Sequence, residues 1–281
     1  MAELIDGKDL AKKIRAELKE EVLELKEKGI NPKLAVIMVG DDPGSQVYVR
    51  NKSKACEKAG IEFEEFLYDE SLTENELLEK IEELNEDDSV HGILLQSPVP
   101  KHININKAFR TISPDKDVDG FNPINVGNLS IGEDAFISCT PYGIVKMLEA
   151  YKIETEGKNA VIIGRSNIVG KPMIQCMLNK NATVTVCHSK TKNIGEVIKN
   201  ADIVIAALGK PRFVTKDMVK DGAVVIDVGI NRLDDGTICG DVDFENVKEK
   251  ASYITPVPGG VGPMTIAMLI YNVVKAAKMR K

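Results

Sequence analysis

Hydrophobic positions in the first half of the chain follow two spacings in turn. Apolar residues recur at helical spacing over residues 10–28, which predicts an amphipathic helix. The unbroken run LAVIMV at residues 34–39 predicts a buried strand, and the turn sequence GDDPGS leads from it into a second helix. A helix near residues 74–84 and a strand over residues 91–95 follow. Strands that alternate with helices in this way predict a parallel sheet with right-handed crossovers.

The second half repeats this alternation. A predicted helix over residues 142–150 precedes four short apolar runs, AVIIG, ATVTVCHS, ADIVIAAL and GAVVIDVG, which helical or loop segments separate. Runs at this spacing predict an open sheet of the dinucleotide-binding, or Rossmann, type. The last helical pattern, residues 264–278, is long enough to pack back on the first domain. We therefore expect an α/β fold with two α/β domains flanking a cleft, one formed by residues 1–140 and 267–281 and the Rossmann domain by residues 141–266.

Length and charge narrow the functional classes. A chain of 281 residues is about twice a common domain length, which suits two domains with separate cores. The net charge of −6 and the isoelectric point near 5.4 argue against a nucleic-acid or anionic-membrane partner, so we expect a small-molecule partner. No apolar run resembles a signal peptide or approaches the roughly 18 residues of a membrane span, and we expect a cytoplasmic protein.

The cysteine and aromatic content adds two expectations. The five cysteines are an odd number, widely spaced and without a Cys-x-x-Cys pair, and the chain has three histidines. We expect neither disulfides nor a bound metal. With no tryptophan and 5% aromatic residues, the core should be aliphatic, which suits parallel sheets buried on both faces.

One lysine falls on the apolar face of a predicted helix. In SQVYVRNKSKACEKA, residues 45–59, Lys52 shares a roughly 100° arc with Ser45, Tyr48 and Ala55. A lysine at such a position can also lay its aliphatic stem over the core and keep its amine in water. The spacing Tyr-x-x-x-Lys also occurs in short-chain dehydrogenases, but those enzymes carry a glycine-rich turn upstream of the pair, and this sequence does not. The lysine is therefore a candidate for chemistry outside that class.

A glycine-rich turn follows the first strand of the second domain. The sequence VIIGRSNIVGKP places Gly164 directly after the strand, Ser166 two residues later and Gly170 where a helix begins. Small residues at such a turn let backbone amides approach a pyrophosphate, which the helix N-terminus favours. The pattern departs from G-x-G-x-x-G, so a tight strand-to-helix turn without a ligand is the alternative.

The end of the next strand bears on which dinucleotide would bind. In a Rossmann unit, an acid about 20 residues after the first glycine binds the ribose hydroxyls and selects NAD. Here the stretch CHSKTK contains no acid, Ser189 offers a hydroxyl, and Arg165 lies in the phosphate turn itself. Lys190 and Lys192 add positive charge, although each could equally be a solvated loop lysine. The pattern favours NADP.

Two polar stretches lie where the first domain would meet a ligand. GILLQSPVP places Gln96 at the C-terminal end of a buried strand, the edge at which open parallel sheets bind ligands. SPDKDVDGF packs Asp115, Asp117 and Asp119 into a loop before a glycine. For that loop, an acidic turn with side-chain caps is the alternative.

Together these segments resemble, in order and spacing, the bifunctional methylenetetrahydrofolate dehydrogenase/methenyltetrahydrofolate cyclohydrolase family. The nine collinear segments are YVRNK, GILLQSPVP, PDKDVDGF, CTPYG, GRSNIVGKPM, CHSKT, ADIVIAALGKP, VIDVGINR and TPVPGGVGPMT, and they cover essentially the whole chain. The resemblance implies oxidation of 5,10-methylenetetrahydrofolate to 5,10-methenyltetrahydrofolate with NADP, then hydrolysis to 10-formyltetrahydrofolate. These reactions would belong to the one-carbon folate interconversions that supply purine biosynthesis.

The resemblance also implies roles for individual residues. The folate would bind in the cleft, with Lys52 as the central catalytic residue, Tyr48 beside it and Gln96 as its hydrogen-bond partner. Asp119 would anchor the amino-pyrimidine edge of the pterin, because a carboxylate accepts two parallel hydrogen bonds. The implied substrate-binding residues are Tyr48, Lys52, Leu95, Gln96, Ser97, Asp119, Pro258, Gly259, Gly260, Val261 and Gly262. The implied NADP-binding residues are Gly164, Arg165, Ser166, Ser189 and Ile230.

Two other interpretations stay open on the sequence alone. An NADP-dependent oxidoreductase of the shikimate-dehydrogenase type also pairs a small α/β substrate domain with a Rossmann domain, and it would lack cyclohydrolase activity. A non-catalytic folate-binding protein would bind both ligands without turnover. The family resemblance further implies a homodimer formed through the second domain.

Overall fold

The computed structural model describes residues 1–279, which divide into two compact units. Residues 12–138 and 266 onward form the three-stranded unit, and residues 1–11 and 139–265 form the six-stranded unit. Each unit is built on a parallel sheet, so the expected α/β class is confirmed. Within residues 1–279, no helix is both long enough and apolar enough to cross a membrane.

The start of the chain belongs to a different unit from the one expected. From the sequence we assign residues 1–140 to one domain, whereas the first eleven residues group with the six-stranded unit. The cause is β1 (Glu3–Leu4), which pairs in parallel with β11 (Tyr253–Ile254) at the edge of that sheet. Such a short strand, with a partner from the far end of the chain, leaves no local pattern to read. Residues 280 and 281 of the expected first domain lie outside the described residues.

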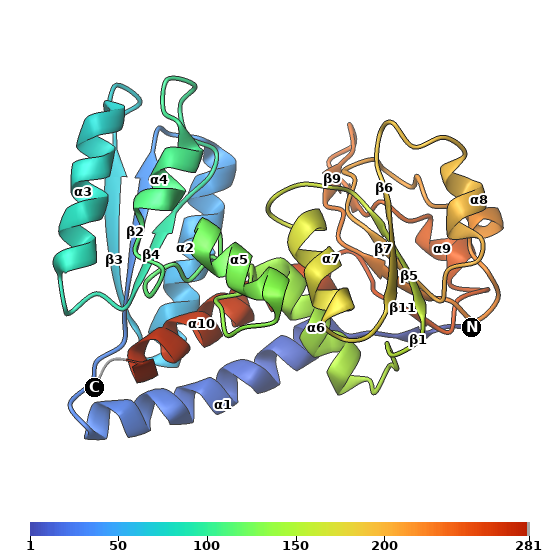
Figure 1. Ribbon diagram of the computed structural model, residues 1–281, viewed down its shortest axis with the longest axis horizontal. Helices are drawn as coiled ribbons and strands as arrows, with labels where there is room; N and C mark the ends of the chain where they lie inside the picture. The colour runs from blue at the N-terminus through green and yellow to red at the C-terminus, as the bar shows by residue number, and fades with distance from the viewer. Residues whose placement is uncertain (280–281) are drawn as a thin grey trace. The chain divides into compact units, whose positions relative to one another are not determined.

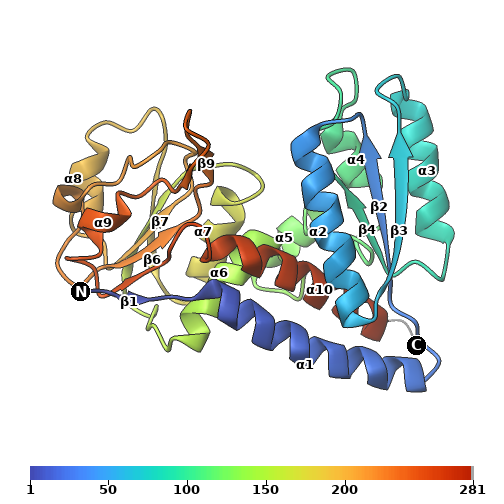
Figure 2. The same ribbon diagram turned by 180° about the vertical axis from the view of Figure 1, so that it is seen from behind.

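Two strands of the three-stranded unit follow the predicted apolar runs, and the third, β3 (Glu62–Tyr68), was not predicted. Its strands are β2 (Lys33–Val39), β3 (Glu62–Tyr68) and β4 (Gly92–Leu95), and its helices include α2 (Pro43–Ala59), α3 (Glu74–Glu86), α4 (Ile105–Thr111) and α5 (Pro123–Ile131). β2 lies between β3 and β4. Ala35, Ile37 and Val39 of β2 pack in one apolar cluster with residues of α3 and α4. Views from two opposite sides show α2 on the other face of the sheet (Figures 1 and 2).

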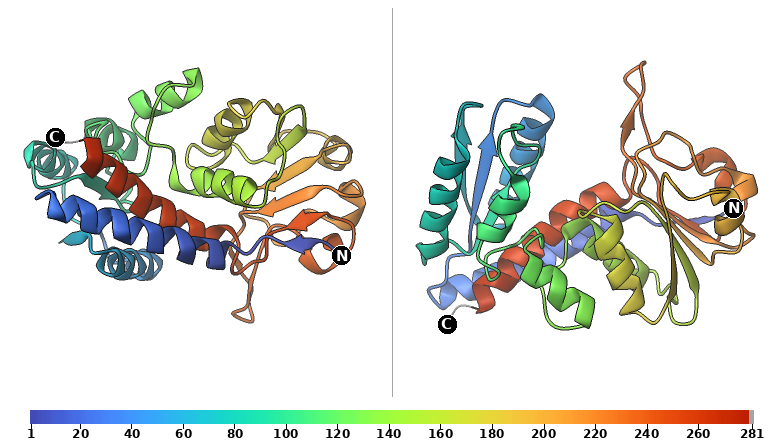
Figure 3. Two further views of the ribbon diagram at one scale, coloured as in Figure 1. Left: turned by 90° about the horizontal axis from the view of Figure 1, so that it is seen from below. Right: turned by 45° about the horizontal axis from the view of Figure 1, so that its top comes forward.

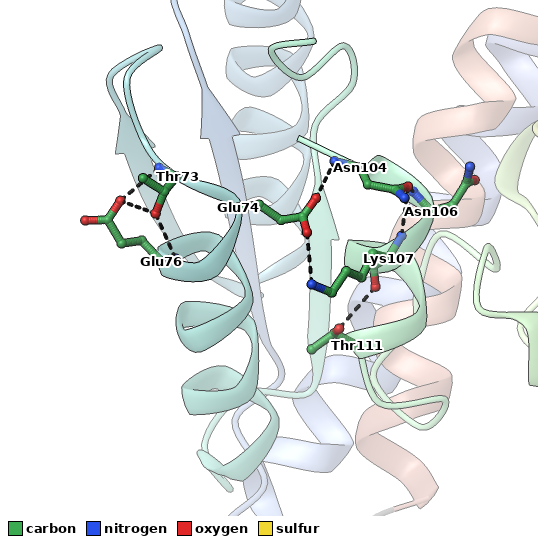
Figure 4. A network of polar contacts seen from close by, with 7 residues as sticks. All are labelled: Thr73, Glu74, Glu76, Asn104, Asn106, Lys107 and Thr111. Atoms are coloured by element: carbon green, nitrogen blue, oxygen red, sulfur yellow. Dashed lines mark hydrogen bonds and ion pairs between the residues drawn. The ribbon is translucent and has the colours of Figure 1, made fainter. Parts of the chain in front are cut away.

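Figure 4 shows the polar contacts that hold α3 against α4. The Oγ1 atom of Thr73 accepts from the N–H of Glu76 at 3.3 Å, and the Glu76 carboxylate accepts from the N–H of Thr73 at 2.8 Å, which makes a capping box. Glu74, in the first turn of α3, then reaches α4. Its carboxylate accepts from the N–H of Asn104 at 2.8 Å and pairs with the Lys107 amine at 2.9 Å. These contacts fix the start of α4, which leads into the loop that carries the three aspartates.

The C-terminal helix packs on the three-stranded unit, as expected. Both α1 (Gly7–Glu27) and α10 (Val261–Met279) run on from the six-stranded unit, and within the three-stranded unit they lie side by side (Figure 3). Lys278 pairs with Glu21 at 2.5 Å. The buried Asn272 donates from Nδ2 to the carbonyl oxygens of Val118 at 2.8 Å and Ile137 at 3.1 Å. The helix therefore holds both the aspartate loop and the segment that follows it.

The six-stranded sheet has the order β1-β11-β8-β7-β5-β6, with all six strands parallel. Its central strands are β5 (Asn159–Ile163), β6 (Thr183–Cys187), β7 (Ile203–Ala206) and β8 (Val224–Asp227), and a small hairpin pairs β9 (Asn231–Arg232) with β10 (Ile238–Cys239). The helical elements are α6 (Cys139–Ala150), α7 (Gly170–Leu178), α8 (Ile194–Ile198), the 3₁₀ turn η1 (Lys216–Met218) and α9 (Phe244–Val247). The chain passes from β5 to β6 on one side and returns to β7 on the other. Open α/β sheets bind ligands at the carboxyl ends of strands where the order reverses in this way.

Candidate functional site

Lys52 lies near the middle of α2, half-buried. The helix begins at the cap residue Asp42, whose Oδ2 accepts from the N–H of Ser45 at 2.7 Å, and it ends at Gly60 in the left-handed conformation. The buried stripe runs through Val49, whereas Tyr48 is 49% exposed. We expected Tyr48 on the buried face of the helix, whereas it lies at the rim of that face. A difference of one position along a helix is enough to move a side chain from the buried face to its rim. Lys52 follows on that rim.

Gln96 holds the Lys52 amine from the end of β4. The Nζ atom of Lys52 donates to Oε1 of Gln96 at 2.9 Å, so the hydrogen bond that the family resemblance implied is present. Gln96 is 9% exposed, and its Nε2 donates to the carbonyl oxygen of Ser97 at 2.7 Å. This second contact fixes which way the amide points and leaves only Oε1 to face the lysine. The Ser45 hydroxyl donates to the same carbonyl at 3.3 Å, so the start of α2 and the end of β4 are linked there.

Two residues near Lys52 and Gln96, Cys56 and Leu95, have side chains that take no part in the candidate site. Cys56, one turn after Lys52, is buried, and burial raises the pKa of its thiol to about 12, although the Lys52 charge acts in the opposite direction. The thiol therefore stays protonated and is a poor nucleophile. Leu95, which we expected to contact substrate, is 2% exposed and packs in the apolar cluster under α3 and α4. Its side chain faces the core.

The three aspartates of the DKDVDGF loop differ in environment. Asp115 is exposed, Asp119 is half-buried and Asp117 is buried. Asp117 accepts from the N–H groups of Phe121 at 3.1 Å and Asn122 at 2.8 Å, and from the side chain of Asn125 at 2.9 Å. Burial raises the pKa of Asp117 to about 7, and these hydrogen bonds offset part of that rise. Asp117 thus shapes the loop, and the half-buried Asp119 stays the carboxylate that the family resemblance implies for binding.

The same loop runs along the edge of β4. Asp117 forms an isolated parallel bridge with Ile93, and the N–H of Ile93 donates to the carbonyl oxygen of Lys116 at 2.8 Å. Because the two segments run in the same direction, one continues to Gln96 and the other to Asp119. The structure therefore brings three of the expected residues, Lys52, Gln96 and Asp119, to one end of the three-stranded sheet.

In the six-stranded unit, Gly164 sits where the sheet order reverses. Its φ angle is +137°, and a Cβ atom there would lie 2.2 Å from the carbonyl oxygen of Ala207, at the end of β7. Only glycine fits such a position. The Ser166 side chain holds the backbone just before the following helix, because its Oγ accepts from the N–H groups of Val169 at 3.1 Å and Gly170 at 3.3 Å. The turn is therefore tight and small, and it leads directly into α7.

Arg165 and Ser189 lie level with each other on neighbouring strand ends. Ile163 of β5 pairs in parallel with Cys187 of β6, and Arg165 and Ser189 each come two residues later, both exposed. A guanidinium and a hydroxyl at this edge suit a phosphate group. The close approach at Gly164 also leaves room for a pyrophosphate beside the backbone. The residues present therefore fit an NADP molecule.

The glycine-rich segment before α10 lies in the six-stranded unit. The N–H of Lys8 donates to the carbonyl oxygen of Gly259 at 2.9 Å, which ties the segment to the start of α1. Val261, one of the residues expected to bind the folate, is buried, so only its backbone could contact a ligand. Ile230 is 56% exposed, and its Cδ1 atom lies 3.8 Å from where a Cβ of Gly262 would stand. Gly262, which we expected to bind the folate, and Ile230, which we expected to bind NADP, thus lie close together.

Sequence reasoning missed two buried carboxylates in the same unit. Asp227 ends β8 and is 2% exposed, and Asp241 follows β10 and is fully buried. Burial raises the pKa of Asp227 to about 6, against the effect of three backbone N–H donors. The signal in the sequence was slight, an acid closing the apolar run VVID and a second acid in CGDVDF.

Comparison with known proteins places both units in one family. Residues 5–119 match the catalytic-domain model of tetrahydrofolate dehydrogenase/cyclohydrolase, and residues 138–281 match the model of its NAD(P)-binding domain. The bifunctional protein FolD of Bacillus subtilis (strain 168) is 57% identical over 277 residues, which are 99% of this chain and 98% of that protein. The crystal structure of the bifunctional enzyme FolD from Campylobacter jejuni is 56% identical, with a TM-score of 0.99 and 100% of each chain covered. The methylenetetrahydrofolate dehydrogenase-cyclohydrolase of Trypanosoma brucei, complexed with NADP and inhibitor, is 38% identical, with a TM-score of 0.94 over 100% of this chain and 99% of that one.

The alternative of a shikimate-dehydrogenase-type oxidoreductase is supported by a distant likeness in fold alone. The shikimate dehydrogenase of Aquifex aeolicus is 15% identical, with a TM-score of 0.51 over 89% of this chain and 92% of that one. At such identity the likeness concerns the fold alone, because one fold carries many activities.

Proposed function

Because the chain belongs to the tetrahydrofolate dehydrogenase/cyclohydrolase family, we propose that it performs both reactions of that family on one folate substrate. It oxidises 5,10-methylenetetrahydrofolate to 5,10-methenyltetrahydrofolate with NADP, and it hydrolyses the product to 10-formyltetrahydrofolate. The main structural support for this proposal is the hydrogen bond of 2.9 Å between Lys52 Nζ and Gln96 Oε1. It fixes an amine at the carboxyl end of the three-stranded sheet.

The oxidation requires positioning more than proton transfer. NADP, when bound, supplies the hydride acceptor. The two nitrogens that flank the methylene carbon stabilise the cation that remains, so no protein base is needed. We assign the positioning of the folate to Asp119, as the acceptor for the pterin's amino-pyrimidine edge, and to Tyr48, whose ring is half-exposed beside Lys52.

The hydrolysis does require proton transfer, because a water molecule attacks the methenyl carbon. Lys52 is the group that we assign to this step. Its Nζ can pass a proton to or from the folate as the ring opens, while Gln96 Oε1 keeps the amine in place. Gln96 is held in turn through Nε2, so the acceptor does not rotate away.

We assign the NADP site to the carboxyl ends of β5 and β6. Arg165 and Ser189 would hold the 2′-phosphate, with Gly164 and Ser166 beside the pyrophosphate and Ile230 nearer the nicotinamide. Residue placement supports this, since Arg165 and Ser189 follow directly paired strand ends. On this assignment the three-stranded unit is the folate-binding catalytic domain and the six-stranded unit is the NADP-binding domain.

Two finer proposals follow from the family resemblance. We infer a homodimer formed through the six-stranded unit, which sedimentation of the purified protein tests. We also infer a cytoplasmic location and a contribution to purine biosynthesis. None of the five cysteines, all of which lie within the described residues, forms a disulfide, which suits a reducing compartment, and cell fractionation tests the location.

One assay on the wild-type protein tests the proposed function. NADPH formation and methenyltetrahydrofolate decay are followed together after 5,10-methylenetetrahydrofolate and NADP are added. We expect NADPH to form and methenyltetrahydrofolate, supplied alone, to decay faster than in buffer. NADPH formation without enzyme-dependent methenyl decay would contradict the cyclohydrolase assignment and favour a plain oxidoreductase. Binding of both ligands without either signal would indicate a non-catalytic folate-binding protein.

A further inference from the structure

The buried carboxylate of Asp241 collects hydrogen bonds from two loops of the six-stranded unit. Its Oδ2 accepts from the N–H groups of Leu208 at 2.7 Å and Gly209 at 2.9 Å. Its Oδ1 accepts from the N–H of Lys210 at 2.8 Å and from the side chain of Asn231 at 2.9 Å. A fully buried carboxylate needs such partners, because an unpaired charge away from water is very costly. Asp241 is therefore the common anchor of the loop after β7 and the segment after β8.

Asp227 holds Asp241 in turn. Its Oδ1 accepts from the N–H groups of Gly229 and Asp241, both at 2.9 Å, and its Oδ2 accepts from the N–H of Val242 at 2.9 Å. Gly229 is pressed against Asp241, since a Cβ atom on Gly229 would lie 2.4 Å from the Cγ atom of Asp241. The donors around both carboxylates are backbone N–H groups, apart from the Asn231 amide. Such contacts fix the path of the chain more directly than pairing with a flexible cation would.

The loops held in this way border the expected NADP residues. Leu208 directly follows Ala207, whose carbonyl oxygen sets the close approach at Gly164. On the other side, Ile230 lies between Gly229, which Asp227 holds, and Asn231, which donates to Asp241. A shift of either carboxylate would therefore move Ala207 or Ile230, or both.

We propose that Asp241 is a positioning residue for the NADP site, holding the β7 loop against the Gly164 turn and Ile230 at the nicotinamide end, with Asp227 fixing Asp241. This rests on the proposed function, and it adds two residues that contact no substrate or cofactor atoms themselves. The alternative is that the two aspartates only stabilise the fold. The two cases differ in outcome, because the cyclohydrolase residues Lys52 and Gln96 belong to the other unit.

Asp241→Asn tests the proposal because it removes the carboxylate charge while the volume of the side chain stays nearly the same. The amide puts an N–H₂ group where one carboxylate oxygen accepted N–H donors, so the β7 loop or Asn231 must move away. We expect the dissociation constant for NADPH, measured by fluorescence titration, to rise about tenfold or more, the usual effect of losing hydrogen bonds to a charged group. The KM for NADP rises with it. Hydrolysis of methenyltetrahydrofolate supplied without NADP stays at the wild-type rate. Amide hydrogen exchange of residues 208–210 becomes faster.

Asp243→Asn is the matched control. Asp243 lies two residues along the same segment, and its carboxylate accepts from the exposed side chain of Asn246. We expect wild-type NADPH affinity and both wild-type activities from this variant.

Asn231→Ala keeps the test decisive if Asp241→Asn does not fold. It removes one donor to Asp241 and leaves the three backbone donors in place, and we expect NADPH affinity to fall about threefold or more. Unchanged NADPH affinity in the folded variants would overturn the proposal, as would an equal loss of NADPH binding, cyclohydrolase rate and thermal stability. Failure of the wild-type protein itself to bind NADPH would instead overturn the proposed function.

Discussion

Lys52 Nζ donates a hydrogen bond of 2.9 Å to Oε1 of Gln96, while Nε2 of the same amide donates to the Ser97 carbonyl oxygen at 2.7 Å. Lys52 comes from the middle of α2 and Gln96 from the end of β4, so the sheet and the helix must both be in place before the amine is held. If the Gln96 amide were turned over, both hydrogen bonds would be lost, because the Lys52 amine would face a second donor and the Ser97 carbonyl oxygen would face a second acceptor. The amine is thus presented at a fixed point at the carboxyl end of the sheet.

Lys52→Met should abolish the cyclohydrolase step and leave the fold intact. The thioether side chain fills a similar volume but transfers no proton, so we expect the rate of methenyltetrahydrofolate hydrolysis to fall by about 10²-fold or more. Lys52 is only half-buried, so the thermal midpoint should change little. Lys54→Met, at an exposed position of the same helix, is the control and should retain activity. Hydrolysis at the wild-type rate in Lys52→Met would remove Lys52 from the mechanism.

Gln96→Glu should impair the same step for a different reason. The carboxylate keeps an acceptor for Lys52 but puts a second oxygen where Nε2 donated to the Ser97 carbonyl oxygen. The two oxygens repel each other, so the side chain must shift and the lysine amine moves with it. We expect the hydrolysis rate to fall about tenfold or more.

The control for this change is Gln46→Glu, at an exposed position of α2, where the amide donates to the Asp41 carbonyl oxygen at 3.3 Å. It makes the same chemical change away from Lys52, and both activities should persist. Equal rates for the wild-type protein and Gln96→Glu would show that the orientation of the Gln96 amide is unimportant.

Much of the fold could be predicted from local patterns. The run LAVIMV became β2 with one residue added, and the four apolar runs of the second half became β5, β6, β7 and β8. Buried parallel strands are nearly continuous apolar runs, so the sequence marks them clearly. β1 escaped prediction because its pairing with β11 depends on a contact between distant parts of the chain.

Candidate site residues could be picked out where a polar residue interrupts an apolar pattern. Lys52, at the edge of an apolar helix face, and Gln96, after an apolar strand, are interruptions of that kind. Asp117 and Asp241 were not predictable as buried anchors, because the sequence of a loop does not show whether an acid in it faces water or accepts hydrogen bonds from backbone N–H groups. Only the folded path of the chain supplies those donors.

Arg165→Ala combined with Ser189→Ala should narrow the preference for NADP over NAD. The two side chains are exposed on neighbouring strand ends, where they can hold a 2′-phosphate that NAD lacks. We expect the ratio of kcat/KM for NADP to that for NAD to fall about tenfold or more, mainly through a higher KM for NADP. Lys199→Ala removes an exposed positive charge elsewhere in the unit and should leave the ratio unchanged. An unaltered ratio in the double variant would exclude both residues from the 2′-phosphate site.

Asp117 should make stability fall as pH rises from about 4 to about 7. Burial raises the pKa of this carboxyl from its ordinary value of 3.8 to about 7 in the folded protein. Between those values the folded protein keeps a proton that the unfolded chain has released. The contribution of Asp117 to the free energy of unfolding is therefore complete below about pH 4 and is lost as pH rises through 7. A single carboxyl can account for a slope of at most about 1.4 kcal/mol per pH unit.

Asp117→Asn removes this titration, so the free energy of unfolding should fall less between those pH values in the variant than in the wild-type protein. Urea unfolding at several pH values measures the two slopes, and their difference isolates Asp117 from the other carboxylates. Asp115→Asn, in the exposed part of the same loop, should keep the wild-type slope. If Asp117→Asn and wild type share one slope, the buried carboxyl is already ionised throughout this range. Its hydrogen bonds from Phe121, Asn122 and Asn125 would then outweigh the cost of burial.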